Sequence, residues 1–427
     1  MGALEVDALV VGAGPAGSTA AFELARRGHS VLVVEEHRRV GHPVQCAGLV
    51  SQRVLDMVGT RKMVLHEVRG ATVWSPSLRP LSFKAPETRA YVLSRSQLDF
   101  LLAEKAARAG ARFETGTKFV GAERSELKSS SAVSAHLQGP EGEEREVRAR
   151  LVIGADGVAS HVARAFRLRR PIEILPAFEA EMPFPGGDPE QVEIYLGNHL
   201  SPGLFGWWVP DGHGNARVGV GVRSGTGKTA REYYEALGRQ IERRYHRPLP
   251  APVEIVVAGI PIGSVPRTSG DHVLLVGDAA AQVKPISGGG IFTGMRCAEI
   301  AAEAAHEALI ANDLSAARLA AYDRAWRAEL GEEFDKALYL RRLFLRLTDR
   351  ELEKLLEVLS ERELLGSLVA FGDIDFPTIA ARKLLAQSPS LLRLFPKALA
   401  ALLRRGGELA PELEPRSASL RLGRNAT

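Results

Sequence analysis

Three glycines near the N-terminus, Gly12, Gly14 and Gly17, have a spacing that suits the binding of phosphate groups. Gly12 permits a tight turn, Gly14 lets a pyrophosphate approach the backbone, and Gly17 lets a helix pack on the preceding strand. Pro15 and Ala16 lie between them, and proline suits the first helical turn because its missing N–H is no loss there. Free N–H groups and the helix dipole would then face the anionic phosphates.

The segments on either side of these glycines have the pattern of a βαβ unit. An apolar run at 8–11 precedes the turn, a helical stretch reaches about residue 27, and a second apolar run covers 30–34. Glu35 follows 18 residues after Gly17, where an acid accepts hydrogen bonds from a ribose 2′-OH. A glycine turn without a ligand is the alternative, but the order of strand, turn, helix, strand and acid favours a dinucleotide site.

Two further aspartates stand where apolar runs end, far along the chain, in Asp156-Gly157 and Gly277-Asp278. In open α/β sheets, ligands bind outside the carboxyl ends of the strands. Three such ends in one chain indicate one long ligand that is touched along its length. FAD has that length, and NAD fits the first segment alone. The alternative for each aspartate is a helix cap or a turn.

The third segment favours FAD over NAD. The Asp278 carboxylate can accept hydrogen bonds from ribityl hydroxyls, and the glycine run at 288–290 after Pro285 allows close backbone approach. A long alanine-rich helix starts there at Ile291, and its N-terminal dipole would stabilise negative charge on a reduced flavin.

Composition adds limits to the class of protein. The chain has 427 residues, 45% hydrophobic and 25% charged, which predicts two interleaved domains plus additions. The net charge of +4 and the absence of zinc-like or helix-turn-helix spacing favour neither nucleic acid nor a metal as partner. The two cysteines, Cys46 and Cys297, lie far apart, so we expect no disulfide framework and a cytoplasmic location. Cys297, inside the alanine-rich helix, is expected to be a core residue.

No apolar run approaches the roughly 18 residues that span a bilayer. The chain begins with a strand that carries Glu5 and Asp7, so we expect no signal peptide. Leucines and arginines alternate around 340–347 and 391–405, a pattern typical of a basic amphipathic helix. Such a helix either packs on the nucleotide-binding domain or lies on the inner face of an anionic membrane.

The pattern of runs predicts an α/β fold: a Rossmann-like FAD-binding domain interleaved with an antiparallel-sheet substrate domain, plus a C-terminal helical region. We expect a helix capped by Ser51, and another that starts at Ser96 with Asp99 as its capping-box partner and stops at Gly110. The expected boundaries are 1–70, 93–168 and 265–330 for the FAD-binding domain, 71–92 and 169–264 for the substrate domain, 331–405 for the helical region and 406–427 for a disordered tail.

The order of these motifs, with Arg95 between the first two, resembles the flavoprotein superfamily of p-hydroxybenzoate hydroxylase. Within it, the chain is similar to the geranylgeranyl reductase family, which includes archaeal digeranylgeranylglycerophospholipid reductases. Four segments carry this narrower match: PVQCAG at 43–48, DGVASHVAR at 156–164, FGWWVP at 205–210 followed by Gly219-x-Gly221, and GDIDFP at 372–377. Two residues depart from the family pattern: Phe205 stands where tyrosine is usual, and Val209 where phenylalanine is usual.

The resemblance implies an FAD-dependent reductase that saturates double bonds of a polyprenyl chain on a lipid, a diphosphate or a quinone. It makes Arg95 a cofactor contact and Cys46, beside the flavin, either the proton donor or a packing residue. The residues expected to bind FAD are Gly12, Gly14, Pro15, Ala16, Gly17, Glu35, Cys46, Ala47, Arg95, Asp156, Gly157, Gly277, Asp278, Pro285, Gly288, Gly289, Gly290 and Ile291. Those expected to bind substrate are Phe205, Trp207, Pro210, Gly219 and Gly221.

Alternation along a strand sends Trp207 and Trp208 to opposite faces, so we expect Trp207 to face the substrate and Trp208 to pack in the core. Trp74 is also expected in the core. The same fold is compatible with an aromatic hydroxylase or other flavin monooxygenase, and with a lipid-binding protein on an FAD scaffold. Because the chain has no second glycine-rich nicotinamide motif, the expected electron donor is ferredoxin or a transiently bound NAD(P)H.

Overall fold

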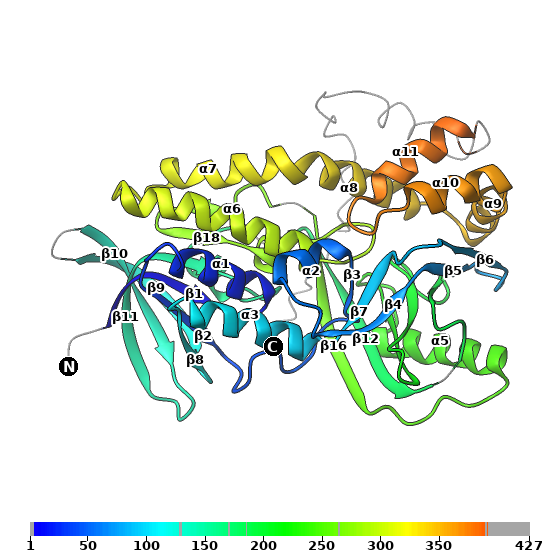
Figure 1. Ribbon diagram of the computed structural model, residues 1–427, viewed down its shortest axis with the longest axis horizontal. Helices are drawn as coiled ribbons and strands as arrows, with labels where there is room; N and C mark the ends of the chain where they lie inside the picture. The colour runs from blue at the N-terminus through cyan, green and yellow to red at the C-terminus, as the bar shows by residue number, and fades with distance from the viewer. Residues whose placement is uncertain are drawn as a thin grey trace, which may run out of the picture.

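The computed structural model describes residues 4–127, 130–169, 171–184, 186–263, 265–388 and 391. Two large sheets lie side by side, and helices cover them (Figure 1). The first sheet has the order β17-β18-β11-β1-β2-β8, and β10 and β9 extend β11 as an antiparallel ribbon. Its strands are β1 (Leu4–Val11), β2 (Val31–Glu35), β8 (Arg112–Thr115), β9 (Lys118–Leu127), β10 (Ser130–Gln138), β11 (Glu144–Gly154), β17 (Ser269–Gly270) and β18 (Val273–Leu275).

The second sheet has seven strands in the order β16-β12-β15-β14-β13-β5-β6, and every neighbouring pair except β13 with β5 is antiparallel. A small third sheet, β3-β7-β4, lies between the two. The strands of the second sheet are β5 (Gly70–Trp74), β6 (Pro80–Lys84), β12 (Glu173–Pro183), β13 (Gln191–Tyr195), β14 (Gly206–Pro210), β15 (Asn215–Gly221) and β16 (Glu254–Ile262). Those of the third are β3 (Leu49–Val50), β4 (Val64–Val68) and β7 (Ala90–Leu93).

Helices cover the first sheet and continue past it. In Figure 1, α7 and α8 follow one another along the top of the molecule and bridge the two large sheets. The helices are α1 (Pro15–Ala25), α2 (Gln52–Val58), α3 (Arg95–Arg108), α4 (His161–Ala165), α5 (Ala230–Tyr245), α6 (Ile291–Ile310), α7 (Ala316–Trp326), α8 (Glu332–Phe344), α9 (Asp349–Leu359), α10 (Arg362–Phe371) and α11 (Pro377–Gln387).

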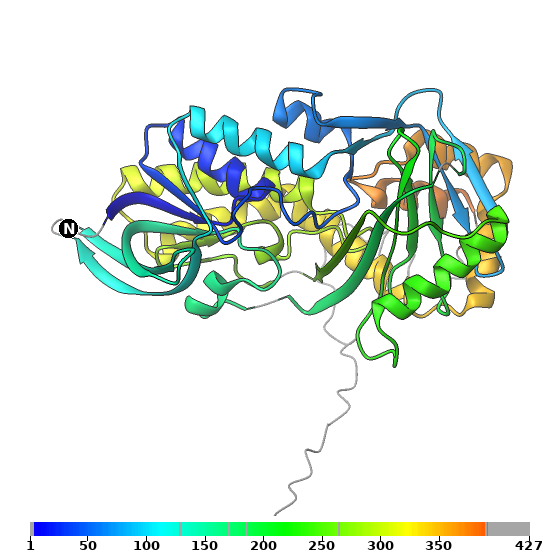
Figure 2. The ribbon, with the colours of Figure 1, turned by 90° about the horizontal axis from the view of Figure 1, so that it is seen from below.

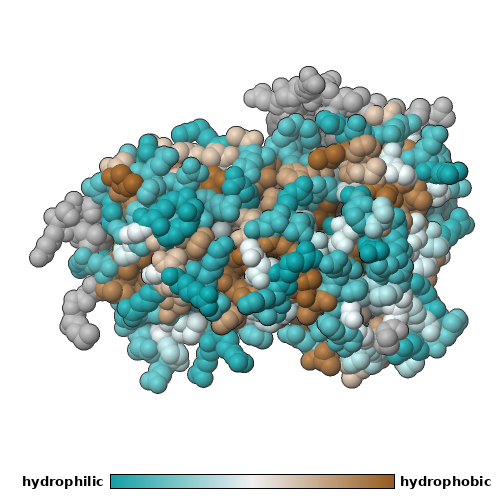
Figure 3. Space-filling model, viewed as in Figure 1, coloured by the Kyte–Doolittle hydropathy of each residue, from teal (hydrophilic) through white to brown (hydrophobic). Residues whose placement is uncertain are grey.

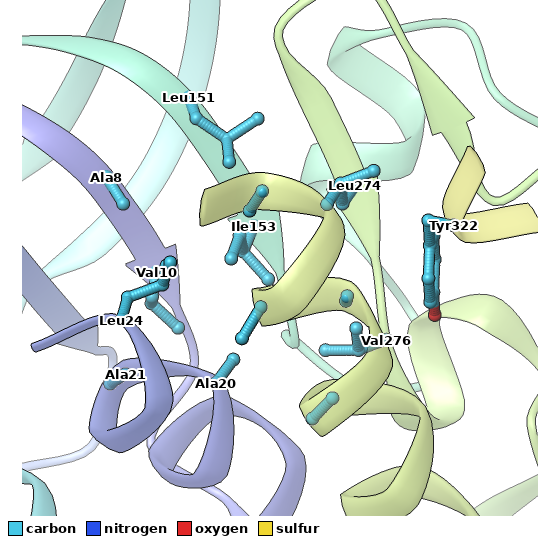
Figure 4. Packing of buried hydrophobic residues seen from close by; sticks show 14 of the residues in the cluster. Ala8, Val10, Ala20, Ala21, Leu24, Leu151, Ile153, Leu274, Val276 and Tyr322 are labelled. Atoms are coloured by element: carbon cyan, nitrogen blue, oxygen red, sulfur yellow. The ribbon is translucent and has the colours of Figure 1, made fainter. Parts of the chain in front are cut away.

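The core of the first half lies where α1 and α6 pack on the parallel strands. Ala8 and Val10 of β1, Ile153 of β11 and Leu274 of β18 point into it, and Tyr322 of α7 closes one side (Figure 4). The facing positions of α1 and α6 are mostly alanines, so the two helices approach each other and the sheet closely. This packing holds the first turn of α1 and the start of α6 at one edge of the sheet.

The register places the carboxyl ends of four parallel strands at that edge. Val11 pairs with both Gly154 and Val34, and Gly154 pairs with Leu275. The segments that follow these strands therefore start next to one another, although those after β1, β11 and β18 lie more than a hundred residues apart in sequence. The mixed α/β architecture predicted from the sequence, with a Rossmann-like part and a separate antiparallel sheet, is confirmed.

The second sheet separates the two neighbouring tryptophans as the alternation predicts. Trp208 is 1% exposed and packs under α5, which covers the outer face of the sheet (Figure 2). Trp207 lies on the opposite face and is only partly buried, next to Phe205. Trp74 is also partly buried and stacks on Tyr195 at the edge of the same core.

Two predicted caps differ from the structure. The expected box between Ser96 and Asp99 is wrong: Ser94 is the N-cap of α3, and Asp99 instead pairs with Arg95 one turn earlier. Ser51 occupies the N-cap of α2, but its buried hydroxyl makes no hydrogen bond among the described residues. Local sequence identified both helices, but the Asp99 carboxylate pairs with Arg95 one turn earlier in α3 and does not form the box.

The structure tests only part of what the sequence indicates about membrane contact. No helix in the described ranges is long and apolar enough to cross a membrane. Hydrophilic side chains cover most of the face shown in Figure 3, and apolar ones form small scattered groups. The leucine and arginine pattern at 391–405 falls almost entirely outside the described residues.

Candidate functional site

The three nucleotide segments meet at the carboxyl edge of the first sheet. Gly12, with a φ of +101°, turns the chain directly against Ala155, where a Cβ at Gly12 would overlap the carbonyl oxygen. On the other side, a Cβ at Gly277 would lie 3.0 Å from the Cβ of Ala16. Because all three turns are in contact, one elongated ligand can touch each of them.

The first turn combines a tight contact with an open space. A Cβ at Gly17 would overlap the carbonyl oxygen of Gly12, so helix α1 packs on the turn as predicted. A Cβ at Gly14 would meet nothing within 4 Å. The first N–H groups of a helix lack intrahelical acceptors. The open space at Gly14 is compatible with a phosphate at this turn, and phosphate binding there stays a prediction.

Glu35 and Asp156 both order the turns beside them. Glu35 accepts hydrogen bonds from the amides of Ala13 (2.9 Å) and His37 (3.0 Å). Asp156 accepts from the Ser160 hydroxyl (2.6 Å) and from two amides at the start of α4. Asp156 thus bonds the first two amides of α4, whose N-cap is Ser160, and this agrees with the structural alternative that its position in the sequence left open. Ribose binding by Glu35 and cofactor binding by Asp156 and Gly157 stay predictions.

Arg95, Cys46 and Asp278 come together from three distant segments. Burial alone would lower the pKa of Arg95, but its hydrogen bonds and charge interactions with Asp99 and Cys46 raise it above the usual value. Burial raises the pKa of Asp278 to about 6, and the charge of Arg95 acts in the opposite direction. The Cys46 thiol accepts a hydrogen bond from the amide of Gly48 at 3.3 Å.

The glycine run predicted beside the flavin packs tightly around this group. A Cβ at Gly290 would lie 3.0 Å from the Asp278 carboxylate, and one at Gly289 would lie 2.9 Å from the Lys284 side chain. Lys284 is itself buried and donates to Asp375 (2.9 Å) and to the carbonyl of Ile374 (2.8 Å). The C-terminal segment is therefore tied to the loop that also carries Pro285 and leads into α6 at Ile291.

A buried arginine joins the loop of Cys46 to the second sheet. Arg217 of β15 donates to the carbonyls of Ala47 (2.7 Å) and Leu93 (2.9 Å), and its Nε donates to Glu181 at 2.8 Å. The side chain of Arg217 is almost fully buried, so these bonds are shielded from water. They hold Cys46 at a fixed place between the two sheets.

Phe205, Trp207, Gly219 and Gly221 lie on the face of the second sheet opposite α5. Pro210 pairs with Ala216 of the core under α5, so it lies on the other face from the rest of the predicted substrate residues. Phe205 and Trp207 lie edge to face with ring centroids 6.3 Å apart. A Cβ at Gly219 would overlap the Trp207 ring, and one at Gly221 would overlap the Leu204 side chain. The two glycines thus make room for large apolar side chains, and Pro210 ends β14 as a buried residue.

The residues present fit FAD. Arg95 Nε is a buried donor without an acceptor among the described residues, and no hydrogen bond there reaches the Asp278 carboxylate. A phosphate or a polar flavin edge would accept the hydrogen bond of Arg95 Nε, and ribityl hydroxyls would donate to the Asp278 carboxylate. The open space at Gly14 matches the approach of a pyrophosphate. Each of these groups has the chemistry that the corresponding part of FAD requires.

Comparisons with known proteins agree with this fit. A family model described as FAD binding domain matches residues 5–327. A digeranylgeranylglycerophospholipid reductase of Methanosarcina acetivorans is 36% identical over 366 residues, which are 83% of this chain and 88% of that protein. Digeranylgeranylglycerophospholipid reductase 2 of Methanopyrus kandleri is 35% identical over 403 residues, 91% of this chain and 98% of that protein. The chain belongs to the digeranylgeranylglycerophospholipid reductase family.

A solved structure supports the same assignment. A geranylgeranyl bacteriochlorophyll reductase-like protein of Thermoplasma acidophilum superposes with a TM-score of 0.80 and is 26% identical. The match covers 94% of this chain and 99% of that one. The resemblance that the motifs indicated is thereby confirmed, and FAD is the cofactor that this family's fold holds.

The two departures from the family's aromatic motif have structural places. Phe205 lacks the hydroxyl of the usual tyrosine and contacts apolar neighbours from β6, β13 and α9. Val209 is buried beside Val92 and Trp207, close to Ala47 of the cysteine loop. A smaller residue at 209 therefore changes the packing between the substrate sheet and the cysteine loop of this family member.

Sequence reasoning missed three charged residues of the site: Arg217, Lys284 and Glu179. Each lies in an apolar strand or loop, and each has a partner far away in sequence. The sequence does contain one indication of such residues: a charged side chain at a strand position that the alternating pattern assigns to a buried face, as at Glu179 and Glu181 of β12. Cys297 is fully buried as predicted.

The C-terminal helices pack on the substrate sheet. Arg341 of α8 is buried and donates to the carbonyl of Gly203 and to Glu173, so it is not a solvated charge. Leu356 of α9 packs with Leu81 and Leu196 of the second sheet region. The 340–347 pattern begins in α8, where Arg341 contacts the second sheet, so this part of the pattern packs on the protein but not on the nucleotide-binding domain that was expected.

Proposed function

We propose that the protein is an FAD-dependent reductase that saturates carbon–carbon double bonds of a polyprenyl chain carried on a lipid. The relatives that match it over most of their length are named for this substrate class. The observation that carries the proposal is the apolar wall of Phe205 and Trp207, positioned on the sheet whose Arg217 holds the cysteine loop beside Arg95 and Asp278.

Saturation of an alkene requires a hydride and a proton on neighbouring carbons. FAD, when bound and reduced, supplies the hydride. The residues of this chain have three tasks: they bind the prenyl chain, exclude water and supply the proton. Phe205 and Trp207 offer large apolar area for the chain. Cys46 is the proposed proton donor, because a small thiol tolerates an apolar site and Arg217 fixes its loop.

We also propose that the protein takes its substrate from a membrane surface. Exposed apolar side chains gather around the edge strand β16 and the start of β12: Ile172, Ile174, Val253, Ile255 and Val257. An apolar group of this kind typically marks an interaction site. Sedimentation with anionic vesicles that contain prenyl lipids tests this contact, and Val257→Ser with Ile255→Ser should reduce the bound fraction. Unchanged sedimentation of that double variant would refute the assignment of this edge.

The decisive experiment for the reaction is anaerobic. The FAD-loaded protein is reduced with dithionite and mixed with geranylgeranyl lipids, so the result does not depend on the natural electron donor. We expect flavin re-oxidation and a product with two added hydrogens for each saturated bond, measured by mass spectrometry. Cys46→Ser should slow turnover, and Cys297→Ser is the matched control, because Cys297 is buried in the core.

Two results would contradict the proposal. Oxygen consumption driven by NAD(P)H with an aromatic substrate, without prenyl saturation, would identify a monooxygenase. Tight binding of prenyl lipids that never re-oxidises the flavin would identify a lipid-binding protein on an FAD scaffold. Turnover that Cys46→Ser leaves unchanged would refute the thiol as proton donor.

A further inference from the structure

Three residues on neighbouring strands of the second sheet form a row across its inner face. Glu179 of β12 pairs with Gly219 of β15, and Gly219 pairs in turn with Trp207 of β14. Side chains opposite one another across paired strands point to the same face. Glu179 and Trp207 therefore lie two strands apart on one face, with a residue that has no side chain between them.

The gap at Gly219 is filled by the indole of Trp207. A Cβ at Gly219 would overlap two atoms of that ring, so the ring lies across β15. Its Nε1 donates a hydrogen bond to Glu179 Oε2 at 2.7 Å. Any side chain at 219 would block this path, and any residue without an acceptor at 179 would leave the indole N–H unpaired. The orientation of Trp207 depends on both positions.

Glu179 is a buried acid with no ion-pair partner among the described residues. It is 5% exposed, and Arg217, whose charge acts on it, is bonded to Glu181 instead. Burial raises the pKa of Glu179 to about 7, the Trp207 hydrogen bond and the charge of Arg217 lower it, and the charges of Glu181 and Glu254 raise it. These groups come from β12, β14, β15 and β16, the strands packed around it. A buried acid costs stability, so its retention here calls for a role.

We propose that Glu179 is a positioning residue of the substrate wall, which pins the Trp207 indole across Gly219 and so sets the surface that a prenyl chain meets. This inference rests on the proposed function for the identity of the chain that is bound. The wall itself is built from Phe205 and Trp207, and Glu179 acts on it only through the indole.

The ionisation of Glu179 changes the strength of this contact. A carboxylate accepts the indole N–H in a charge-assisted bond, about twice as strong as the bond to a neutral acid. The carboxylate predominates above pH 7, since the pKa of Glu179 is about 7. The affinity for a prenyl lipid should therefore rise as the pH increases from about 6 to 8, and it should become independent of pH in Glu179→Gln.

The test compares Glu179→Leu, which removes the acceptor, with Glu179→Gln, which keeps an acceptor that does not titrate. In FAD-loaded protein with geranylgeranyl lipid, we expect Glu179→Leu to raise KM about tenfold, with kcat changed less than threefold, because one hydrogen bond that orients the wall is lost. Glu179→Gln should have a near-normal KM with a flat pH profile. Glu254→Gln is the control, since Glu254 faces Glu179 without bonding to Trp207.

A second readout needs neither cofactor nor turnover. The tryptophan emission of the cofactor-free protein should titrate with a midpoint near pH 7, and the step should vanish in both Glu179→Gln and Trp207→Phe. A step that persists in Glu179→Gln would overturn the proposal, as would a Glu179→Leu protein with normal KM and normal lipid affinity. If Glu179→Leu fails to fold, the emission titration of Glu179→Gln decides alone.

The two proposals fail separately. Lipid binding that depends on Glu179 in a protein that never saturates prenyl lipids would refute the reductase function and keep the positioning role. Normal saturation with lipid affinity that is the same in wild type and Glu179→Leu would refute only the positioning role.

Discussion

Gly14→Ala separates the demands of the cofactor from those of the fold. Gly14 has a φ of −68° and a ψ of −177°, which any residue adopts, and a Cβ there meets nothing within 4 Å. Gly14 is the N-cap of α1, where alanine is less favourable than glycine, and this offsets the smaller entropy of the unfolded chain. The cofactor-free protein should therefore tolerate the alanine, with a free energy of unfolding changed by no more than about 1 kcal/mol. A pyrophosphate, however, must approach the backbone through the space that the new methyl group fills.

The expected loss of FAD affinity follows from the bonds that the methyl group prevents. A hydrogen bond from a backbone N–H to a charged phosphate contributes about 1.5–3 kcal/mol. Loss of one such bond weakens binding about 10- to 100-fold. Gly17→Ala is the matched comparison, because its Cβ would overlap the carbonyl oxygen of Gly12. We expect Gly17→Ala to lower the free energy of unfolding of the cofactor-free protein by about 3 kcal/mol.

The assay combines denaturant unfolding of the cofactor-free variants with FAD titration followed by quenching of flavin fluorescence. The reasoning predicts opposite profiles: Gly14→Ala stable but weak in FAD binding, and Gly17→Ala already destabilised without FAD. A Gly14→Ala protein that binds FAD like wild type would refute the assignment of this turn to the pyrophosphate. Equal destabilisation of both variants would refute the packing argument.

Three further predictions concern the buried charges. The pKa of Glu179 rises from 4.5 to about 7 on folding, so the wild type loses stability as the pH rises through this range. Between pH 4 and 8, the free energy of unfolding of Glu179→Gln should increase by about 3 kcal/mol relative to wild type, measured by denaturant unfolding. Arg217→Met should lower the free energy of unfolding by about 3 kcal/mol. It should also speed alkylation of Cys46, followed by mass spectrometry, and an unchanged rate would contradict the role of Arg217 in holding the cysteine loop. Lys284→Met removes the buried ion-pair partner of Asp375, so limited proteolysis should cut the segment 372–377 faster than in wild type. Equal rates would contradict the inference that Lys284 holds this segment in place.

The fold was predictable because its signals are local. Alternation and apolar runs located β14, β15 and the long helix α6, and turn glycines located the end of the first strand. The helix of α3 was also predicted, but its first residue was not. There, Asp99 pairs with Arg95 four residues earlier on the same helix and does not form a capping box. That spacing is visible in the sequence, but the burial of both side chains, which favours the pair, depends on the rest of the fold.

The sequence predicts the candidate site where the backbone conformation or close packing requires glycine. It does not predict the hydrogen bonds that join segments far apart in the chain. Gly17 is required by its contact with Gly12 within one βαβ unit, while Gly12 is required by its positive φ and by the backbone of Ala155 after β11. Arg217 and Ala47, by contrast, are 170 residues apart, and their bond exists only because the two sheets pack together. A charged residue within an apolar strand indicates that such a long-range bond exists, but the sequence of the strand does not identify its partner.

These bridges explain how two sheets with separate cores can present one site. Packing of apolar side chains determines how far apart the sheets lie, but it is tolerant of small shifts. Directed hydrogen bonds tolerate smaller shifts: Arg217 must reach the carbonyls of Ala47 and Leu93 while its Nε stays on Glu181. Lys284 does the same for the glycine loop and the C-terminal segment. The buried charges therefore set the alignment of wall, thiol and cofactor, and variants that remove them should impair turnover more than they impair the binding of FAD or of lipid measured alone.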